Sequence, residues 1–97
     1  NKDTVIGEQV TVGDNTIIAK DVTVGDNTTI GTDTIVAKDV NIANDVTIGD
    51  NVSIAKEVTI GSGASIGNNV TIEKGATISP DAIVPDGAII PQNSTYP

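Results

Sequence analysis

The charged side chains of this 97-residue chain recur at a fixed interval, which makes them the first candidates for a functional site. All five basic residues are lysines eighteen positions apart: Lys2, Lys20, Lys38, Lys56 and Lys74. An acidic row follows the lysines at Asp21, Asp39 and Glu57. Such paired rows could bind a charged lattice or polymer. Neighbouring rows of opposite sign also relieve the repulsion within each row and keep strand edges soluble, and we favour this structural role.

Aspartate and asparagine side chains form two further rows, one at Asp14, Asp50 and Asn68 and the other at Asp26 and Asn44. Closely spaced carboxylates can coordinate Ca²⁺, but the glycine- and aspartate-rich nonapeptide of calcium-loaded β-rolls is absent from the sequence. Because Asp and Asn tolerate left-handed backbone angles, we predict that these residues form turns and hold no metal.

The sequence contains no His and no Cys. Imidazole is the side chain best suited to proton transfer near neutral pH, and zinc sites use nitrogen or sulfur ligands in nearly all proteins. We therefore predict no catalytic residue, no metal site and no cofactor, and we expect that the chain is not an enzyme.

Hydroxyl and aliphatic side chains also recur. One hydroxyl row, predicted on one face, comprises Thr11, Thr29, Thr47 and Ser65, and a second, predicted on another face, contains Thr23, Thr59 and Thr77 together with Asn41 and Thr95. Regular Thr arrays resemble those of insect ice-binding proteins, so binding to ice or another crystal surface is one hypothesis; Thr is also a good strand former for a solvated face. A third row, Ile17, Ile35, Ser53, Thr71 and Ile89, predicts either a subunit interface or isolated exposed aliphatic residues.

The composition excludes several classes of partner. The formal net charge is −8 and the pI is about 4.1, so phosphate backbones and anionic membrane surfaces are repelled. No stretch is long and apolar enough for a membrane span. We therefore expect neither nucleic acid nor a membrane as a partner.

A six-residue repeat must position all of these rows. The best aliphatic position recurs every six residues without an insertion, from Ile6, Val12, Ile18, Val24, Ile30 and Val36 through Ile42, Ile48, Ile54, Ile60 and Ile66 to Ile72, Ile78, Val84, Ile90 and Tyr96. A small or β-branched residue stands two positions before each. Positions two apart in a strand point to the same side, so each hexad predicts a short strand with two inward residues, followed by a corner.

The eighteen-residue spacing of the lysines groups three hexads into one coil. We predict an all-β fold: a triangular parallel β-solenoid of a little over five coils that forms a single domain over residues 1–97. Pro80, Pro85, Pro91 and Pro97 predict a C-terminal cap over about 79–97, because proline removes backbone donors. The N-terminal end shows no comparable cap, so that edge is open or upstream residues are missing.

The pattern resembles the hexapeptide-repeat family, as in Ile48-Gly49-Asp50-Asn51-Val52-Ser53. This resemblance implies a left-handed parallel β-helix, and side-by-side trimers are common in the family. The segment VPDGAIIPQNS is similar to the final coil of γ-class carbonic anhydrases. Acyltransferases of the family use a His, and the γ-class carbonic anhydrases bind zinc through three His residues; this sequence has neither feature.

We accordingly expect a non-catalytic structural scaffold or assembly module, engineered or consensus-like because of its uniformity. Self-association is expected as side-by-side trimers or end-to-end stacks. The alternatives are a Thr-array surface-binding protein and a fragment of a hexapeptide-repeat acyltransferase or carbonic-anhydrase-like enzyme.

Overall fold

The computed structural model describes residues 4–97, which form sixteen two-residue strands joined by tight corners. The strands are β1 (Val5–Ile6), β2 (Thr11–Val12), β3 (Ile17–Ile18), β4 (Thr23–Val24), β5 (Thr29–Ile30), β6 (Ile35–Val36), β7 (Asn41–Ile42), β8 (Thr47–Ile48), β9 (Ser53–Ile54), β10 (Thr59–Ile60), β11 (Ser65–Ile66), β12 (Thr71–Ile72), β13 (Thr77–Ile78), β14 (Ile83–Val84), β15 (Ile89–Ile90) and β16 (Thr95–Tyr96). The described part of the chain contains no helix with the length and apolar character of a membrane crossing.

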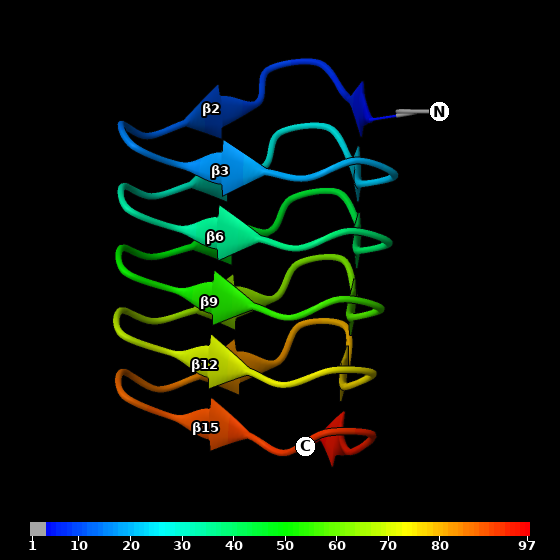
Figure 1. The fold of residues 1–97 in the computed structure, drawn as a ribbon, viewed down its shortest axis with the longest axis vertical. Helices are drawn as coiled ribbons and strands as arrows, with labels where there is room; N and C mark the ends of the chain where they lie inside the picture. The colour runs from blue at the N-terminus through cyan, green and yellow to red at the C-terminus, as the bar shows by residue number, and fades with distance from the viewer. Residues whose placement is uncertain (1–3) are drawn as a thin grey trace.

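Each strand pairs in parallel with the strand three places along the chain, and this pairing produces three flat faces (Figure 1). Face A contains β1, β4, β7, β10, β13 and β16; face B contains β2, β5, β8, β11 and β14; face C contains β3, β6, β9, β12 and β15. The register is eighteen residues throughout, as in Thr29 beside Thr47 and Ile35 beside Ser53. The predicted coil of three hexads is confirmed.

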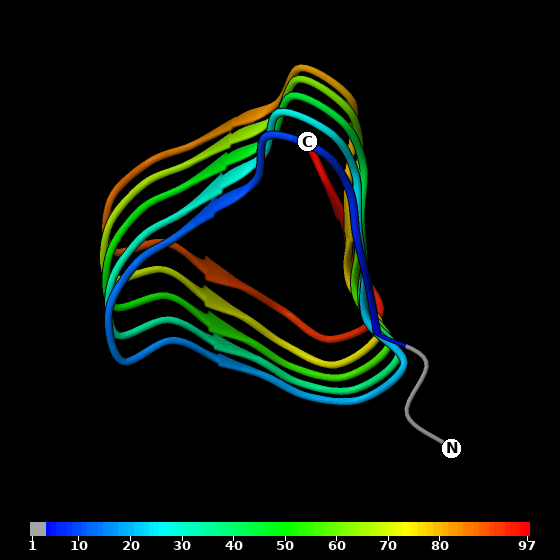
Figure 2. The same ribbon diagram turned by 90° about the horizontal axis from the view of Figure 1, so that it is seen from above.

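The solenoid is left-handed. Viewed from the N-terminal end, the chain runs anticlockwise around the triangle as it recedes (Figure 2). The prism measures 29 × 23 × 23 Å. We name its three edges by the faces they join: the AB corner (residues 7–9 and the equivalent positions of later coils), the BC corner (13–15 and equivalents) and the CA corner (19–21 and equivalents).

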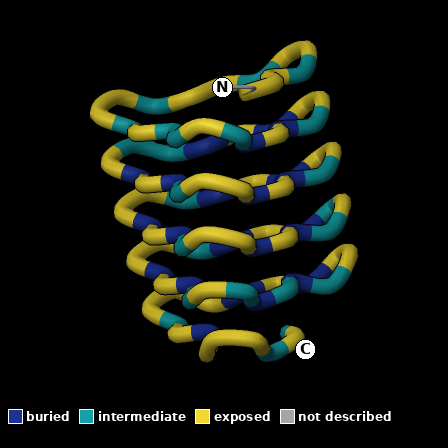
Figure 3. The backbone as a smooth tube through the Cα atoms, turned by 45° about the vertical axis from the view of Figure 1, so that its right-hand side comes forward, coloured by how far each residue is buried: buried dark blue, intermediate teal, exposed yellow. Residues whose placement is uncertain are grey.

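The core is a thin layer of Ile, Val and Ala in the middle of the prism (Figure 3). The inward aliphatic residues from Val22 to Ile90 are almost completely buried, except Ala88, which is partly buried. Two threonines, Thr28 and Thr34, also point inward with no exposed surface, and their hydroxyls donate to the carbonyls of Ala43 and Gly49 in the next coil. No buried side-chain polar atom among the described residues lacks a hydrogen-bond partner, as a core of this kind requires.

Backbone hydrogen bonds stack the coils. On the faces, the N–H of one residue donates to the carbonyl seventeen positions later, as from Thr29 to Val46, and these N···O distances are 2.7 to 3.1 Å. At the corners, a residue with positive φ donates back to the preceding coil, as from Asn51 to Thr32. Twelve of these left-handed positions hold residues other than Gly, mostly Asp and Asn, the non-glycine residues that adopt this conformation most readily.

Asp and Asn side chains tie successive coils together at two corners. Asn68 Oδ1 accepts from the Asp50 N–H at 2.8 Å, and Asp86 Oδ1 accepts from the Asn68 N–H at 2.8 Å. The same bond links Asp50 to the N–H of Thr32, Asn44 to Asp26 and Asp26 to Glu8. Asp26, Asn44, Asp50 and Asn68 of the predicted rows are therefore rungs of a side-chain ladder at the AB and BC corners, and Asp86 extends it.

Close stacking of the corners restricts the first corner residue. A Cβ at Gly49 would collide with Asn68 Oδ1 and with the backbone carbonyl of Gly67, and one at Gly31 would collide with Asp50 Oδ1 and the carbonyl of Gly49. Ala occupies the same corner position at Ala19, Ala37 and Ala55, where the residue nineteen positions later is Lys, and at Ala43, where it is Ser62. Ala is therefore found at the AB corner as well as at the CA corner, in each case above a side chain that is not part of the Asp and Asn ladder.

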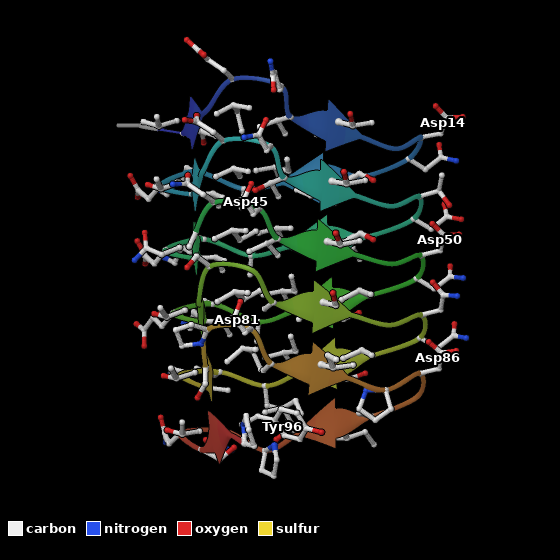
Figure 4. All side chains as sticks on the ribbon, turned by 180° about the vertical axis from the view of Figure 1, so that it is seen from behind. Asp14, Asp45, Asp50, Asp81, Asp86 and Tyr96 are labelled. Carbon is white, nitrogen blue, oxygen red and sulfur yellow. The ribbon has the colours of Figure 1, made fainter. Side chains whose placement is uncertain are left out.

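The two ends of the prism differ. In the first coil, the inward residues Ile6 and Val12 are 44% and 42% exposed. At the other end Tyr96 packs against the bottom of the core (Figure 4). Gly67, Glu73 and Ser79 donate backbone hydrogen bonds to the coil below them. One coil later the equivalent positions are occupied by Pro85, Pro91 and Pro97, which have no N–H. The last coil therefore lacks three donors on its lower edge.

The coupling between Gly49 and Asn68 can be measured with a double-mutant cycle. We expect Gly49→Ala to cost about 1–3 kcal/mol in the free energy of unfolding, because the new Cβ collides with the next coil. Asn68→Ser should cost about 1 kcal/mol through the lost hydrogen bond. The double variant reproduces the natural Ala43–Ser62 pair, so its loss should be smaller than the sum of the two by about 1 kcal/mol. Urea unfolding measures all three, and strict additivity would contradict the coupling.

Glu57 is a weak point of the CA corner, since its φ is +64°. Glu57→Asp keeps the charge and introduces a residue that adopts this conformation more readily, so we expect stabilisation of about 0.5 kcal/mol. The reverse change one coil earlier, Asp39→Glu at φ +63°, is the matched control and should destabilise by a similar amount. Thermal and urea unfolding provide the measurement; a destabilised Glu57→Asp variant would contradict the argument.

Candidate functional site

The first hydroxyl row forms a single column on face B. Thr11, Thr29, Thr47 and Ser65 are neighbours in successive strands, and all four side chains are exposed. The column ends at Ile83, which pairs with Ser65. Ile83 is 74% exposed, more than the other large apolar side chains that lie on the surface. Our prediction from the sequence did not include it, although continuing the count of outward positions by one coil would have found it.

The second hydroxyl row lies on a different face. Thr23, Thr59 and Thr77 lie on face A, where Asn41 interrupts the column between Thr23 and Thr59. The two rows are therefore separated by the AB corner and do not form a two-rank array on one plane. Faces A and B each present at most one outward hydroxyl per coil, and the function of these rows stays a prediction.

The isoleucine row lies along the middle of face C. Ile17 and Ile35 are adjacent and are 60% and 48% exposed, while Ile89 at the other end is 66% exposed. Ser53 and Thr71 stand between them in the same column. The apolar surface is thus concentrated in the first two coils and the last coil, and its role as an interface stays a prediction.

All four described lysines lie on the CA corner, and each is exposed. Lys2 lies outside the described residues. Asp21, Asp39 and Glu57 follow the lysines on the same corner, on the side that leads into face A. In the coils of Lys20, Lys38 and Lys56 the lysine is therefore the charged residue nearer to face C, whereas Glu73 comes between face C and Lys74. The BC corner, at the opposite edge of face C, carries Asp14, Asp33, Asp50 and Asp86 and no cation; three of these are labelled in Figure 4.

The Lys and acidic rows pack less tightly than the Asp and Asn ladder. The corner hydrogen bonds from Asp39 to Lys20 and from Glu57 to Lys38 are 3.4 and 3.2 Å long, whereas those of the AB and BC corners are 2.9 to 3.0 Å.

The prism is filled by its own side chains: residues 4–97 enclose no pocket, and no group of three or more His, Cys, Asp or Glu in that range could hold a metal ion. The surfaces on which another molecule could bind are thus the three faces and their corners.

The fold closely matches those of solved transferases. A hexapeptide transferase family protein from Anaplasma phagocytophilum superposes with a TM-score of 0.90 at 22% identity, covering 96% of this chain and 58% of that one. Perosamine N-acetyltransferase from Caulobacter crescentus, a mutant in complex with CoA and GDP-perosamine, gives 0.71 at 23% identity, covering 96% and 47%. The acetyltransferase domain of PglB from Neisseria gonorrhoeae gives 0.66 at 16% identity, covering 96% and 50%. The chain therefore spans about half the length of these structures.

Our expectation that the chain is not an enzyme is wrong, because proteins that share its fold over nearly its whole length are acetyltransferases. That expectation depended on the missing histidine. In these enzymes the part that matches this chain is only about half of the polypeptide, so the residue types of one β-helix do not determine whether the protein is catalytic.

Sequence comparison agrees with the structural one. No curated protein matches the sequence significantly. The model of the bacterial transferase hexapeptide family, which describes six repeats, matches twice in succession, over residues 3–38 and 39–74. Each match spans two coils of the prism. The chain therefore belongs to the bacterial transferase hexapeptide family.

Proposed function

We propose that this chain is the β-helix of an acetyltransferase that takes its acetyl group from acetyl-CoA, and that the lysines of the CA corner contact the phosphates of this donor. The observation that carries the proposal is the match to the bacterial transferase hexapeptide family over residues 3–74. A fold neighbour is an N-acetyltransferase in complex with CoA and GDP-perosamine. The acceptor in our proposal is accordingly an amine.

The charge distribution supports this location for the donor. CoA carries several phosphate charges, and the AB and BC corners carry carboxylates without a cation, so they repel it. The CA corner is the one that carries cations: Lys38, Lys56 and Lys74 stand one above another in successive coils and are exposed, with Asp39, Glu57 and Glu73 as their chain neighbours. Lysine binds phosphate as a point charge with three donors. A CoA molecule lying along this corner can place its phosphates on neighbouring lysines while its acyl arm follows the prism.

The reaction itself sets a further requirement. The acceptor nitrogen forms a bond to the acetyl carbon, the carbon–sulfur bond of the thioester breaks with its electron pair leaving on the CoA sulfur, and the proton lost by the amine ends on that sulfur. This sequence has no imidazole to carry the proton, so the proton passes directly, through one of its carboxylates or through a group outside these 97 residues. The β-helix contributes a rigid surface on which the thioester is held, and positioning of this kind lowers the entropic part of the barrier.

Titration with acetyl-CoA tests the proposal. We expect Lys56→Gln/Lys74→Gln to weaken binding about tenfold or more, because charge-assisted hydrogen bonds to phosphate are lost. Thr29→Gln/Thr47→Gln on face B is the matched control and should bind like the unaltered protein. Calorimetry or fluorescence competition gives the dissociation constants, and N-acetylation of amino-sugar nucleotides by the polypeptide that carries this β-helix gives the activity.

Acetyl-pantetheine separates the phosphate contacts from those of the acyl arm. It lacks the nucleotide phosphates, so the lysine variants should bind it as the unaltered protein does. Equal acetyl-CoA affinity in the lysine variants would disprove the phosphate contact. Failure of acetyl-CoA to bind or to support transfer in the polypeptide that carries the β-helix would disprove the function.

A further inference from the structure

Asp86 and Gly87 lie on the BC corner of the last coil (Figure 4), and they form the only Asp–Gly pair in the sequence, which contains no Asn–Gly pair. An aspartate followed by glycine is chemically reactive, because the glycine nitrogen can approach the carboxyl carbon of the preceding side chain without hindrance from a Cβ. Both residues are exposed, and a Cβ added at Gly87 would meet no atom within 4 Å. Neighbouring side chains therefore leave this pair uncovered.

One residue of the coil above holds both reacting groups. The Asn68 N–H donates to Asp86 Oδ1 at 2.8 Å, and the Gly87 N–H donates to the Asn68 carbonyl at 2.9 Å. In this arrangement the carboxylate is turned toward Asn68, and the nitrogen that would attack it keeps its proton in a hydrogen bond. The stacked corner is therefore the protected form of the pair.

Asp50 and Asn51 provide an internal comparison on the same corner. The Thr32 N–H donates to Asp50 Oδ1 at 2.9 Å, and the Asn51 N–H donates to the Thr32 carbonyl at 2.9 Å. This pair is also held from below, because the Asp50 N–H donates to Asn68 Oδ1 at 2.8 Å. Its second residue carries a Cβ, which hinders attack by the nitrogen. The two pairs thus share a clamp from above and differ in their chemistry and in their support from below.

The corner that carries Asp86 lies at the edge of the described prism. The strands that flank it, β14 and β15, each pair with a single neighbour, β11 and β12. Pro85 and Pro91 follow these two strands and have no N–H that could hold a further coil. Segments paired on one side open with a lower free energy than segments in the middle of a sheet. The clamp on Asp86 is therefore released more often than the clamp on Asp50.

We propose that Asp86–Gly87 is a modification site, at which isoaspartate forms when the last coil opens at the BC corner. In the open state the Gly87 nitrogen bonds to the carboxyl carbon of the protonated Asp86 side chain. The N–H proton and the carboxyl hydroxyl leave as one water molecule, and a succinimide ring results. Addition of water then breaks one of the two ring C–N bonds. When the bond to the Asp86 main-chain carbonyl breaks, the main chain continues through the former side-chain carbonyl.

Isoaspartate does not restore the clamp. It lengthens the main chain by one methylene before Gly87, and it attaches the free carboxylate directly to the α-carbon. Both groups that contact Asn68 are displaced as a result, so the hydrogen bonds to its N–H and its carbonyl are lost. The modification therefore keeps the BC corner of the last coil open. This inference does not rest on the acetyltransferase proposal.

Ageing of the intact chain tests the site. After several weeks at neutral pH and physiological temperature, trypsin releases residues 39–56 and 75–97 as separate peptides. Methylation by a protein isoaspartate methyltransferase and electron-transfer fragmentation then locate isoaspartate. We expect it at Asp86 and at least about tenfold less at Asp50, and the chain unfolded in guanidinium chloride should react at Asp86 at least about tenfold faster than the folded chain. Equal rates in the folded and unfolded chains, or equal amounts at the two sites, would overturn the proposal.

Loosening one end of the prism tests the dependence on opening. Tyr96→Ala removes a side chain that packs against the bottom of the core, so isoaspartate at Asp86 should accumulate about three- to tenfold faster. Tyr96→Val is the milder change and should give an intermediate rate. Ile18→Ala removes apolar contacts near the opposite end and should leave the rate at Asp86 unchanged. Circular dichroism verifies that these variants remain folded.

Gly87→Ala tests the attacking nitrogen. It is compared with the unaltered chain in guanidinium chloride, where backbone strain at this position plays no part, and it should lose most of the isoaspartate because its Cβ hinders the attack. Undiminished isoaspartate in Gly87→Ala, or a rate at Asp86 that neither change at Tyr96 raises, would overturn the proposal.

Discussion

The stacking of one coil on the next supports every other feature of this molecule. Its strands are only two residues long, too short to be stable alone, and its corners contain non-glycine residues in left-handed conformations that cost free energy. Each coil is held by backbone hydrogen bonds on all three faces and at the corners. The Asp and Asn rungs add a side-chain bond at two of the corners, as between Asn68 and Asp50. This regular pairing replaces the large aromatic core of an ordinary domain, which a chain with a single aromatic residue cannot build.

Because stacking uses the backbone, the outward side chains are free to vary and therefore carry the specific properties of the protein. The columns on the three faces have the same geometry but different chemistry: hydroxyls on faces A and B, and isoleucines on face C. The corners divide in the same way. The AB and BC corners use Asp and Asn to bind the neighbouring coil, whereas the CA corner has lysines whose side chains remain exposed. A β-helix of this family thus separates the residues that hold it together from the residues that can meet another molecule.

This separation explains why the functional prediction from sequence was less reliable than the structural one. Catalysis in a rigid solenoid does not require a pocket inside it, so the filled interior and the missing histidine say nothing about chemistry performed on its surface or beside it. What the surface presents to another molecule depends on the positions of a few side chains, such as Lys56 and Ile35, on an otherwise uniform prism.

The hexad pattern by itself determined the sixteen strands, the coil of eighteen residues, the buried Ile and Val positions and the turns, because all of these depend on local periodicity and on residues that tolerate positive φ. Left-handedness came from the family resemblance, since a short period does not distinguish one hand from the other. Only the tertiary structure decided what lies above and below each residue. It showed that a Cβ at Gly49 would collide with Asn68 Oδ1 and with the Gly67 carbonyl of the next coil, whereas Ala43 stands over Ser62. The physical reason is that these contacts join residues eighteen or nineteen positions apart, and they exist only once the coil has closed and stacked.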